Sequence, residues 1–236
     1  MNLHSIINKL SYAVWPTACL SCQEITSGEA VCHFCFQEFP WNSISCSQCG
    51  LPWDTSINTT RCGTCITHPP AFEMTLAPFL YHPPITQFIT QLKFHRQLHY
   101  AHFFGTMLAE RIATPLPQYL IPVPLHPRRL RQRGFNQAVE IAKPLAKRLH
   151  IPVALNACYR SKNTAPQTEL PAKQRHTNVK NAFTINPLFH AEHVAIIDDV
   201  ITTGSTVREL SLLLLKHHVS KIDIWCCARA AIAATV

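Results

Sequence analysis

Apolar and polar positions alternate with two different periods from about residue 76 onward. Short apolar runs, typical of strands, are separated by stretches whose apolar residues recur every three or four positions, which is typical of helices. This succession predicts βαβ units, and therefore an α/β domain with a mostly parallel sheet and flanking helices. The predicted strands are 76–81, 119–123, 153–159, 183–185, 194–197 and 222–226, and the predicted helices are one beginning at 83–84, then 100–113, 135–149 and 205–218.

The segment from Val194 to Thr206 joins a strand to a candidate ligand site. Val194–Ile197 is entirely apolar, so we expect a parallel strand covered on both faces, ending at the carboxylates Asp198 and Asp199. The following turn, Thr202–Thr206, is rich in hydroxyls, and a turn of this kind before a helix presents backbone N–H groups to an anion. Carboxylates beside such a turn suit a phosphorylated polyol. The alternative is an ordinary strand–turn–helix with a surface Asp pair and a Ser or Thr N-cap.

A second strand–loop–helix, residues 121–137, carries four arginines and one glycine in its loop. Guanidinium groups bind pyrophosphate through paired hydrogen bonds, and glycine lets the backbone approach a ligand. We therefore expect a pyrophosphate loop here, and the alternative is a solvated basic loop. The candidate residues are Arg128, Arg129, Arg133 and Gly134 for pyrophosphate, and Arg128, Arg129, Arg131 and Arg133 for nucleic acid.

Residues 160–178 are polar and basic without a clear period, which is typical of a lid over a reactive centre or of a plain surface loop. As a lid, this segment offers Arg160, Gln167 and Arg175 to a ligand. Lys93 lies at the end of a predicted helix, where we expect it to cap helix carbonyls rather than contact phosphate.

Eleven cysteines are present, and eight of them form four CxxC pairs. Two such pairs supply the four thiolates of a tetrahedral Zn²⁺ site, so four pairs predict about two structural zinc ions. Disulfides, a redox motif and crossed pairing are the alternatives. The predicted ligand sets are Cys19, Cys22, Cys32 and Cys35, and Cys46, Cys49, Cys62 and Cys65; Cys158, Cys226 and Cys227 fall in predicted strands, where we expect buried apolar roles.

The 236 residues divide by composition into a cysteine-rich part, 1–70, with an N-terminal amphipathic helix, and the α/β part, 71–236. The formal net charge of +8 favours an anionic partner: a phosphorylated metabolite, a nucleic acid or an acidic lipid surface. No apolar run approaches the roughly 20 residues of a spanning helix, and no signal-peptide pattern is visible. We therefore expect a cytoplasmic protein without stable membrane insertion.

These features together resemble the ComF/GntX family of competence-associated proteins, which combine a double zinc ribbon with a type I phosphoribosyltransferase-like domain. The resemblance covers nearly the whole chain through the four CxxC pairs and the segments 91–95, 122–138, 160–183 and 194–206. It implies that 5-phosphoribosyl-1-pyrophosphate (PRPP), with magnesium, is bound through Asp198, Asp199, Thr202, Thr203, Gly204, Ser205 and Thr206, and that 160–178 is a hood loop.

Position 202 holds Thr, whereas purine-salvage phosphoribosyltransferases have an Asp thought to act as the base, and this argues against nucleobase transfer. Three functions remain. The first is a PRPP-binding protein that handles single-stranded DNA during uptake, with Phe94 and Phe135 beside arginines to stack on bases. The second is transfer of phosphoribose to ammonia or a small nitrogen acceptor. The third is a PRPP sensor whose zinc ribbon contacts a partner protein such as the DNA-uptake machinery.

Overall fold

The computed structural model describes residues 17–53, 59–162 and 181–231, and it divides into two compact units, 1–40 and 41–236. Within the first unit, strand β1 (Thr17–Ala18) pairs antiparallel with β2 (Ile25–Thr26), and a short helix α2 (His33–Gln37) follows. The predicted N-terminal helix and the hood-loop residues Gln167 and Arg175 lie outside the described residues.

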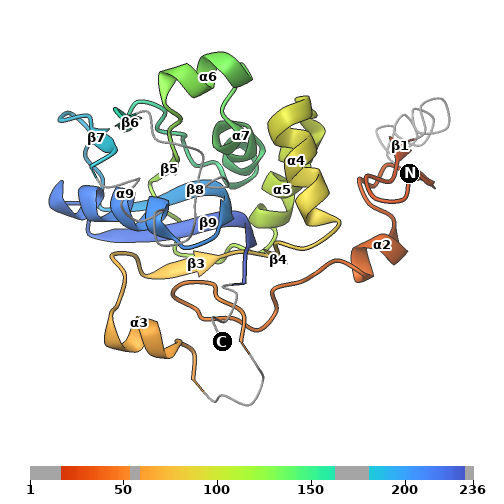
Figure 1. The fold of residues 1–236 in the computed structure, drawn as a ribbon, viewed down its shortest axis with the longest axis horizontal. Coiled ribbons are helices and arrows are strands. Elements are labelled where there is room, and N and C mark those ends of the chain that lie inside the picture. The colour runs from red at the N-terminus through yellow and green to blue at the C-terminus, as the bar shows by residue number, and fades with distance from the viewer. Residues whose placement is uncertain (1–16, 54–58, 163–180, 232–236) are drawn as a thin grey trace, which may run out of the picture. The chain divides into compact units, whose positions relative to one another are not determined.

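The second unit is built around a five-stranded sheet whose strand pairs are all parallel (Figure 1). Two long strands, β8 (His193–Ile201) and β9 (Lys221–Arg229), form its centre. Strand β5 (Tyr119–Pro122) flanks β8, while β3 (Met74–Leu76) and β4 (Phe79–Leu80) both pair with β9. The predicted α/β class with a mostly parallel sheet is confirmed.

Helices and a small antiparallel ribbon surround this sheet (Figure 1). The ribbon consists of β6 (Cys158–Arg160) and β7 (Phe183–Ile185). The helices that the structure describes in the second unit are α3 (Gly63–Thr67), α4 (Ile85–His95), α5 (His99–Ala109), α6 (Pro127–Arg133), α7 (Gln137–Leu149) and α9 (Ser205–Lys216).

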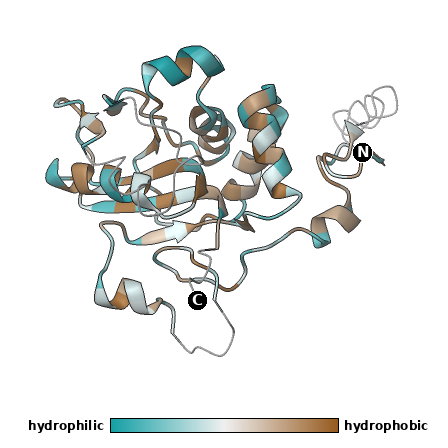
Figure 2. Cartoon of the chain, viewed as in Figure 1, coloured by the Kyte–Doolittle hydropathy of each residue, from teal (hydrophilic) through white to brown (hydrophobic). Residues whose placement is uncertain are grey.

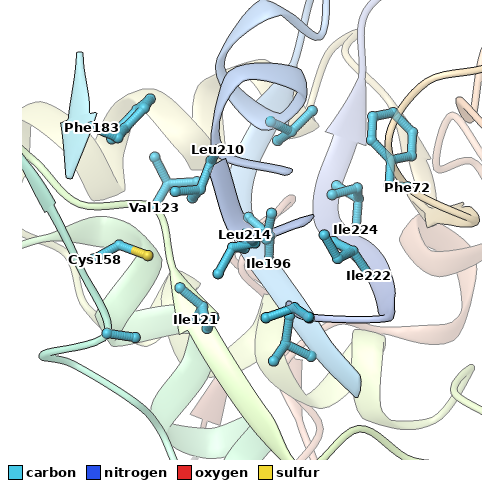
Figure 3. Close-up of a cluster of buried hydrophobic side chains, with 14 of the residues drawn as sticks. Phe72, Ile121, Val123, Cys158, Phe183, Ile196, Leu210, Leu214, Ile222 and Ile224 are labelled. Carbon is cyan, nitrogen blue, oxygen red and sulfur yellow. The ribbon is translucent and has the colours of Figure 1, made fainter. Parts of the chain in front are cut away.

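Apolar residues predominate along β8 and β9 (Figure 2), and their burial on successive positions shows that both faces of the sheet are covered. On one face, Ile196 and Ile224 pack with Leu210 and Leu214 of α9 in a buried cluster that reaches Phe183 of the ribbon (Figure 3). Because strand residues alternate between faces, their neighbours point the other way, where α5 and α7 contact the sheet. Burial on both faces explains why β8 is apolar from Val194 to Ile197.

Helices α5 and α7 approach closely because Gly105 has no side chain. A Cβ at this position would lie 2.5 Å from Pro144 Cγ and 2.6 Å from the Ile141 carbonyl oxygen. Pro144 lies inside α7 without ending it.

Three predicted elements differ from the structure. The strand predicted at 76–81 is two short strands, because Pro78 lacks the N–H that a continuous ladder requires. The strand predicted at 153–159 is a single bridge at Val153 followed by a turn and then β6. The arginine-rich loop is the helix α6, which begins at Pro127 and ends at Gly134 in the left-handed conformation.

Candidate functional site

A cavity of about 700 Å³ lies at the carboxyl ends of β4, β5 and β8, which is where ligands bind in open parallel sheets. It brings together segments that are far apart in the chain: the end of α4, helix α6, strand β6 and the turn between β8 and α9. Residues that line it include Tyr81, Lys93, Phe94, Arg96, Arg129, Gln132, Arg133, Gln137, Arg160, Asp198, Asp199, Thr202, Gly204, Ser205 and Thr206.

The two predicted carboxylates lie inside β8 rather than after it, because the strand continues to Ile201. Asp198 is 9% exposed and Asp199 is 3% exposed. The backbone N–H of Asp199 donates to Asp198 Oδ1 at 2.9 Å. Although both side chains are buried, both line the cavity and can therefore contact a ligand there.

Lys93 forms an ion pair with Asp199 through Nζ and Oδ2. The expectation that Lys93 caps helix carbonyls is therefore wrong. The last turn of α4 carries Leu92 into the core, and Lys93 follows it on the side that faces β8. A sequence pattern gives the position of Lys93 on the helix but not the residue of another element that its side chain will meet.

The two aspartates have opposite pKa shifts. Burial and the neighbouring Asp199 raise the pKa of Asp198 well above its usual range. Burial also acts to raise the pKa of Asp199, but Lys93 outweighs it and the pKa is lowered. For Lys93, burial lowers the pKa and Asp199 raises it, with a net increase. The free protein thus favours an ionised Lys93–Asp199 pair beside a carboxyl group that retains its proton more readily.

The turn after β8 has the geometry of an anion cradle. Gly204 has φ +76° and caps α9, whose first residue, Ser205, is buried. Thr203 Oγ1 lies 2.8 Å from Ser205 Oγ and accepts a hydrogen bond from the Ser205 N–H at 3.4 Å. The N-terminus of a twelve-residue helix therefore meets the cavity, with hydroxyl groups beside it. Thr203 is the one residue of Thr202–Thr206 that supports the turn rather than lining the cavity.

The helical conformation of α6 determines which of the four predicted arginines reach the cavity. Arg129 and Arg133 are four residues apart, on one helix face, and both line the cavity. Arg128 and Arg131 are not among the lining residues. Gly134 does not line it either: a Cβ there would lie 3.2 Å from a guanidinium nitrogen of Arg96, so the glycine makes room for that arginine.

Arg160, the one described residue of the predicted hood-loop set, reaches the cavity from β6 and stacks over the Phe183 ring at 5.4 Å. Burial lowers the pKa of Arg133 and of Arg160, and the positive charge of Arg129 acts in the same direction on both. Among the described lining residues, the cations Lys93, Arg96, Arg129, Arg133 and Arg160 outnumber the two aspartates. This excess of positive charge around the cavity favours an anionic ligand.

One of the two aromatic residues expected to stack on bases lines the cavity. Phe94 is 67% exposed, and the Arg133 guanidinium lies 5.6 Å from its ring centroid. Phe135 is not among the lining residues. Arg133 itself is held in place by a 2.5 Å hydrogen bond to Gln137 Oε1.

The eight CxxC cysteines gather in two groups with the predicted membership. In each group the four sulfurs lie within 4.8 Å of one another. The Cys22–Cys32 and Cys49–Cys62 sulfur separations are 3.8 and 3.7 Å. A tetrahedral site with Zn–S bonds of about 2.3 Å requires about 3.8 Å between sulfurs, so both groups fit zinc.

Backbone N–H groups support one sulfur of each group, as in zinc knuckles. Cys19 Sγ accepts from the N–H of Cys32, and Cys46 Sγ accepts from the N–H of Cys62, both at 3.3 Å. The first group lies in the unit 1–40 and the second in the unit 41–236. The division of the structure thus falls between the two cysteine groups, whereas the boundary predicted from composition, near residue 70, stays a prediction.

These observations define a class: a protein with two four-cysteine clusters that fit zinc and an α/β domain whose cavity is lined by more cations than carboxylates. A double zinc ribbon domain matches residues 10–66. The chain belongs to the ComF/YhgH family. It is 34% identical over 206 residues to the DNA utilization protein YhgH of Escherichia coli K12, covering 84% of this chain and 90% of that protein. It is 35% identical to competence protein F of Haemophilus influenzae, covering 84% and 89%.

Two solved structures are similar at low TM-score. Adenine phosphoribosyltransferase from Thermoanaerobacter pseudethanolicus has a TM-score of 0.37 and 14% identity, covering 57% of this chain and 83% of that one. Glutamine PRPP amidotransferase from B. subtilis has a TM-score of 0.38 and 18% identity, covering 53% and 25%. Scores this low carry no functional conclusion.

Among the described residues, no helix combines the length and the apolar character needed to cross a bilayer.

Sequence reasoning did not find Tyr81, Arg96, Gln132 or Gln137 as lining residues. Gln132 and Gln137 lie inside the recognised segment 121–137, and Arg96 directly follows the segment 91–95, so proximity to a motif was the available signal for these three.

Proposed function

We propose that the cavity binds PRPP with magnesium. The observation that carries this proposal is the meeting of an Asp pair, a hydroxyl-rich helix N-terminus and four arginines in one cavity. A ribose with a phosphate at one end and a pyrophosphate at the other requires these three kinds of groups, in that arrangement.

Each part of the ligand has a matching part of the cavity. Thr202–Thr206 and the start of α9 suit the 5′-phosphate. Asp198 and Asp199 suit the ribose hydroxyls or the magnesium, since hard cations prefer carboxylate oxygens. Arg129, Arg133 and Arg160 suit the pyrophosphate. Magnesium, when bound, neutralises part of the pyrophosphate charge. The hood-loop roles of Gln167 and Arg175 belong to this proposal as well.

The relatives are named for DNA utilization and for competence. We extend the proposal accordingly: the protein handles single-stranded DNA during DNA uptake, with PRPP as a ligand of the same domain. The net charge of +8 and the exposed Phe94 beside Arg133 support contact with a flexible polyanion that carries bases.

A second candidate is transfer of phosphoribose to ammonia or another small nitrogen acceptor. The side chain at position 202, which lines the cavity, is a hydroxyl and not a carboxylate. A hydroxyl is a poor general base at neutral pH, and an unprotonated amine acceptor requires no base to expose its lone pair. A sensor that binds PRPP without transfer is consistent with the same residue.

Calorimetry on the full chain tests the proposal. We expect saturable binding of PRPP with Mg²⁺, weaker binding of ribose 5-phosphate and of pyrophosphate alone, and binding of a single-stranded oligonucleotide. Absence of PRPP binding overturns the ligand assignment. If PRPP binds but the oligonucleotide does not, the DNA role is overturned and the transferase is favoured. Transferase activity would then be measured as release of pyrophosphate from PRPP in the presence of ammonia.

A further inference from the structure

Arg229, at the end of β9, connects the start of the turn Thr202–Thr206 to the second cysteine group. Its side chain is almost fully buried, with 3% of the residue exposed. Its Nε donates to the backbone carbonyl of Cys49 at 3.0 Å. One terminal nitrogen donates to the carbonyls of Ile201 at 3.1 Å, Ala230 at 2.7 Å and Thr202.

These contacts fix the orientation of two peptide groups at the start of the turn. In a trans peptide the C=O and the N–H point in opposite directions. Because the carbonyls of Ile201 and Thr202 face Arg229, the N–H groups of Thr202 and Thr203 face away from it. Arg229 therefore sets the direction of backbone donors in the segment that we assign to the 5′-phosphate.

At the other end, the knuckle 46–50 is joined to the sheet by several hydrogen bonds. Thr75 of β3 donates through Oγ1 to the Gln48 carbonyl at 2.7 Å and through its N–H to Ser47 at 3.1 Å. Gln48 Nε2 donates to the Phe72 carbonyl at 3.0 Å. Gly50, at φ +67°, lies so close to Thr75 that a Cβ would be 2.9 Å from its methyl group. The position of the Cys49 carbonyl thus depends on the knuckle, and the knuckle depends on its metal.

The hydrogen bond from Nε to the Cys49 carbonyl also places the Arg229 guanidinium beside the second cysteine group. Four thiolates outweigh the charge of one Zn²⁺, so a filled site leaves negative charge near this buried guanidinium.

We propose that Arg229 is a positioning residue through which zinc at Cys46, Cys49, Cys62 and Cys65 controls the affinity of the cavity for a phosphorylated ribose. This inference rests on the proposed function, because it requires the 5′-phosphate to bind at Thr202–Thr206. A purely structural role for Arg229, limited to filling space between β9 and the knuckle, is the competing explanation.

The first test measures ribose 5-phosphate binding by calorimetry in the zinc-loaded full chain. Arg229→Lys keeps the positive charge, but lysine lacks the planar guanidinium whose separate nitrogens contact the knuckle and the turn at the same time. We expect about tenfold weaker binding, with zinc content unchanged. Arg148→Lys is the matched control, since Arg148 is half-exposed and pairs with Glu110 away from the cavity. Binding by Arg229→Lys at the parent's affinity overturns the proposal.

The second test compares the two cysteine groups and does not depend on how Arg229→Lys folds. Cys62→Ser is expected to weaken ribose 5-phosphate binding about tenfold, and Cys22→Ser, in the other unit, to leave it unchanged. Equal effects of the two variants overturn the proposal. Hydrogen exchange on the parent, with and without chelator, checks whether the amides of Thr202–Thr206 lose protection when zinc leaves. If the parent itself binds no ribose 5-phosphate and no PRPP, it is the proposed function that fails.

Discussion

Lys93 and Asp199 form an ion pair across the cavity, between the last turn of α4 and the inside of β8. The pair balances the charge of Asp199 and leaves the adjacent Asp198 without an equivalent cation. The two aspartates are neighbours in sequence but differ in their electrostatic state, since the pKa of Asp198 is raised and the pKa of Asp199 is lowered.

Single substitutions of the two aspartates should change stability in opposite directions. Asp198→Asn removes a buried carboxyl group that burial and Asp199 both disfavour in its ionised form, so we expect the thermal midpoint at pH 7 to rise by about 3 °C. Asp199→Asn leaves Lys93 without its partner and should cost about 2 kcal/mol. Calorimetric melting of both variants checks this. A lower midpoint for Asp198→Asn would contradict the charge assignment.

The pH dependence of ligand binding should report Asp198. Its raised pKa means that the folded protein holds a proton that the unfolded chain releases, so this contribution to stability is present at low pH and is lost as pH rises through the folded pKa. Binding of PRPP with Mg²⁺ requires the carboxylate, so affinity should increase over the same rise in pH. Titration calorimetry at several pH values measures both the affinity and the proton release. Asp198→Asn together with Asp199→Asn should abolish binding while leaving the fold intact.

The arginines of α6 should separate PRPP binding from DNA binding. Arg129→Gln with Arg133→Gln should weaken PRPP binding at least about tenfold, since each removes a charged hydrogen-bond donor from the cavity. Arg128→Gln with Arg131→Gln should leave PRPP binding unchanged. If these two arginines contact DNA phosphates, the second double variant should also flatten the salt dependence of oligonucleotide binding by about 0.7 per lost contact. An unchanged slope would place the DNA contact elsewhere.

Metal analysis should return two zinc ions per chain for protein purified under reducing conditions, because each four-cysteine group has the sulfur spacing of a tetrahedral site. Cys22→Ser should reduce the content to about one, with the α/β unit still folded. Protein without zinc would refute the metal assignment.

The contact between α5 and α7 gives a test of packing that does not involve the site. Gly105→Ala should cost about 2 kcal/mol, since the added methyl group overlaps Pro144 and the Ile141 carbonyl. Gly63→Ala is the matched control: a Cβ there meets nothing within 4 Å, so its midpoint should be unchanged or slightly higher. Denaturant unfolding of the two variants provides the comparison.

The sequence predicted those parts of the site that are continuous in the chain. An apolar strand, two aspartates and a hydroxyl-rich turn are local features, so 194–206 was identified from its own residues. CxxC spacing was sufficient for the zinc ligands, because both sulfurs of a knuckle come from one short segment. Helix α6 was missed because its arginines show no apolar period, although Pro at its start and Gly at its end are known helix signals.

The remaining site residues depend on tertiary packing. Lys93 and Arg96 reach the cavity only because the end of α4 lies near Asp199 of β8, and Arg160 only because β6 borders the same cavity as α6. Arg229 has no local signal at all: it follows a run of apolar strand residues and finds its acceptors in two distant segments. Sequence periodicity specifies the face of an element but not the neighbour that the face will meet.

Strand β3 lies at one end of the sheet order, and an edge strand with free backbone groups is a template for pairing with another chain. In this protein the knuckle 46–50 covers that edge, since the Ser47 and Gln48 carbonyls accept from Thr75. A fragment that begins after the second cysteine group would expose β3 to self-association. We therefore expect metal at this group to lower the tendency of β3 to self-associate, and a soluble fragment of the α/β unit should begin at Trp41 rather than at residue 71.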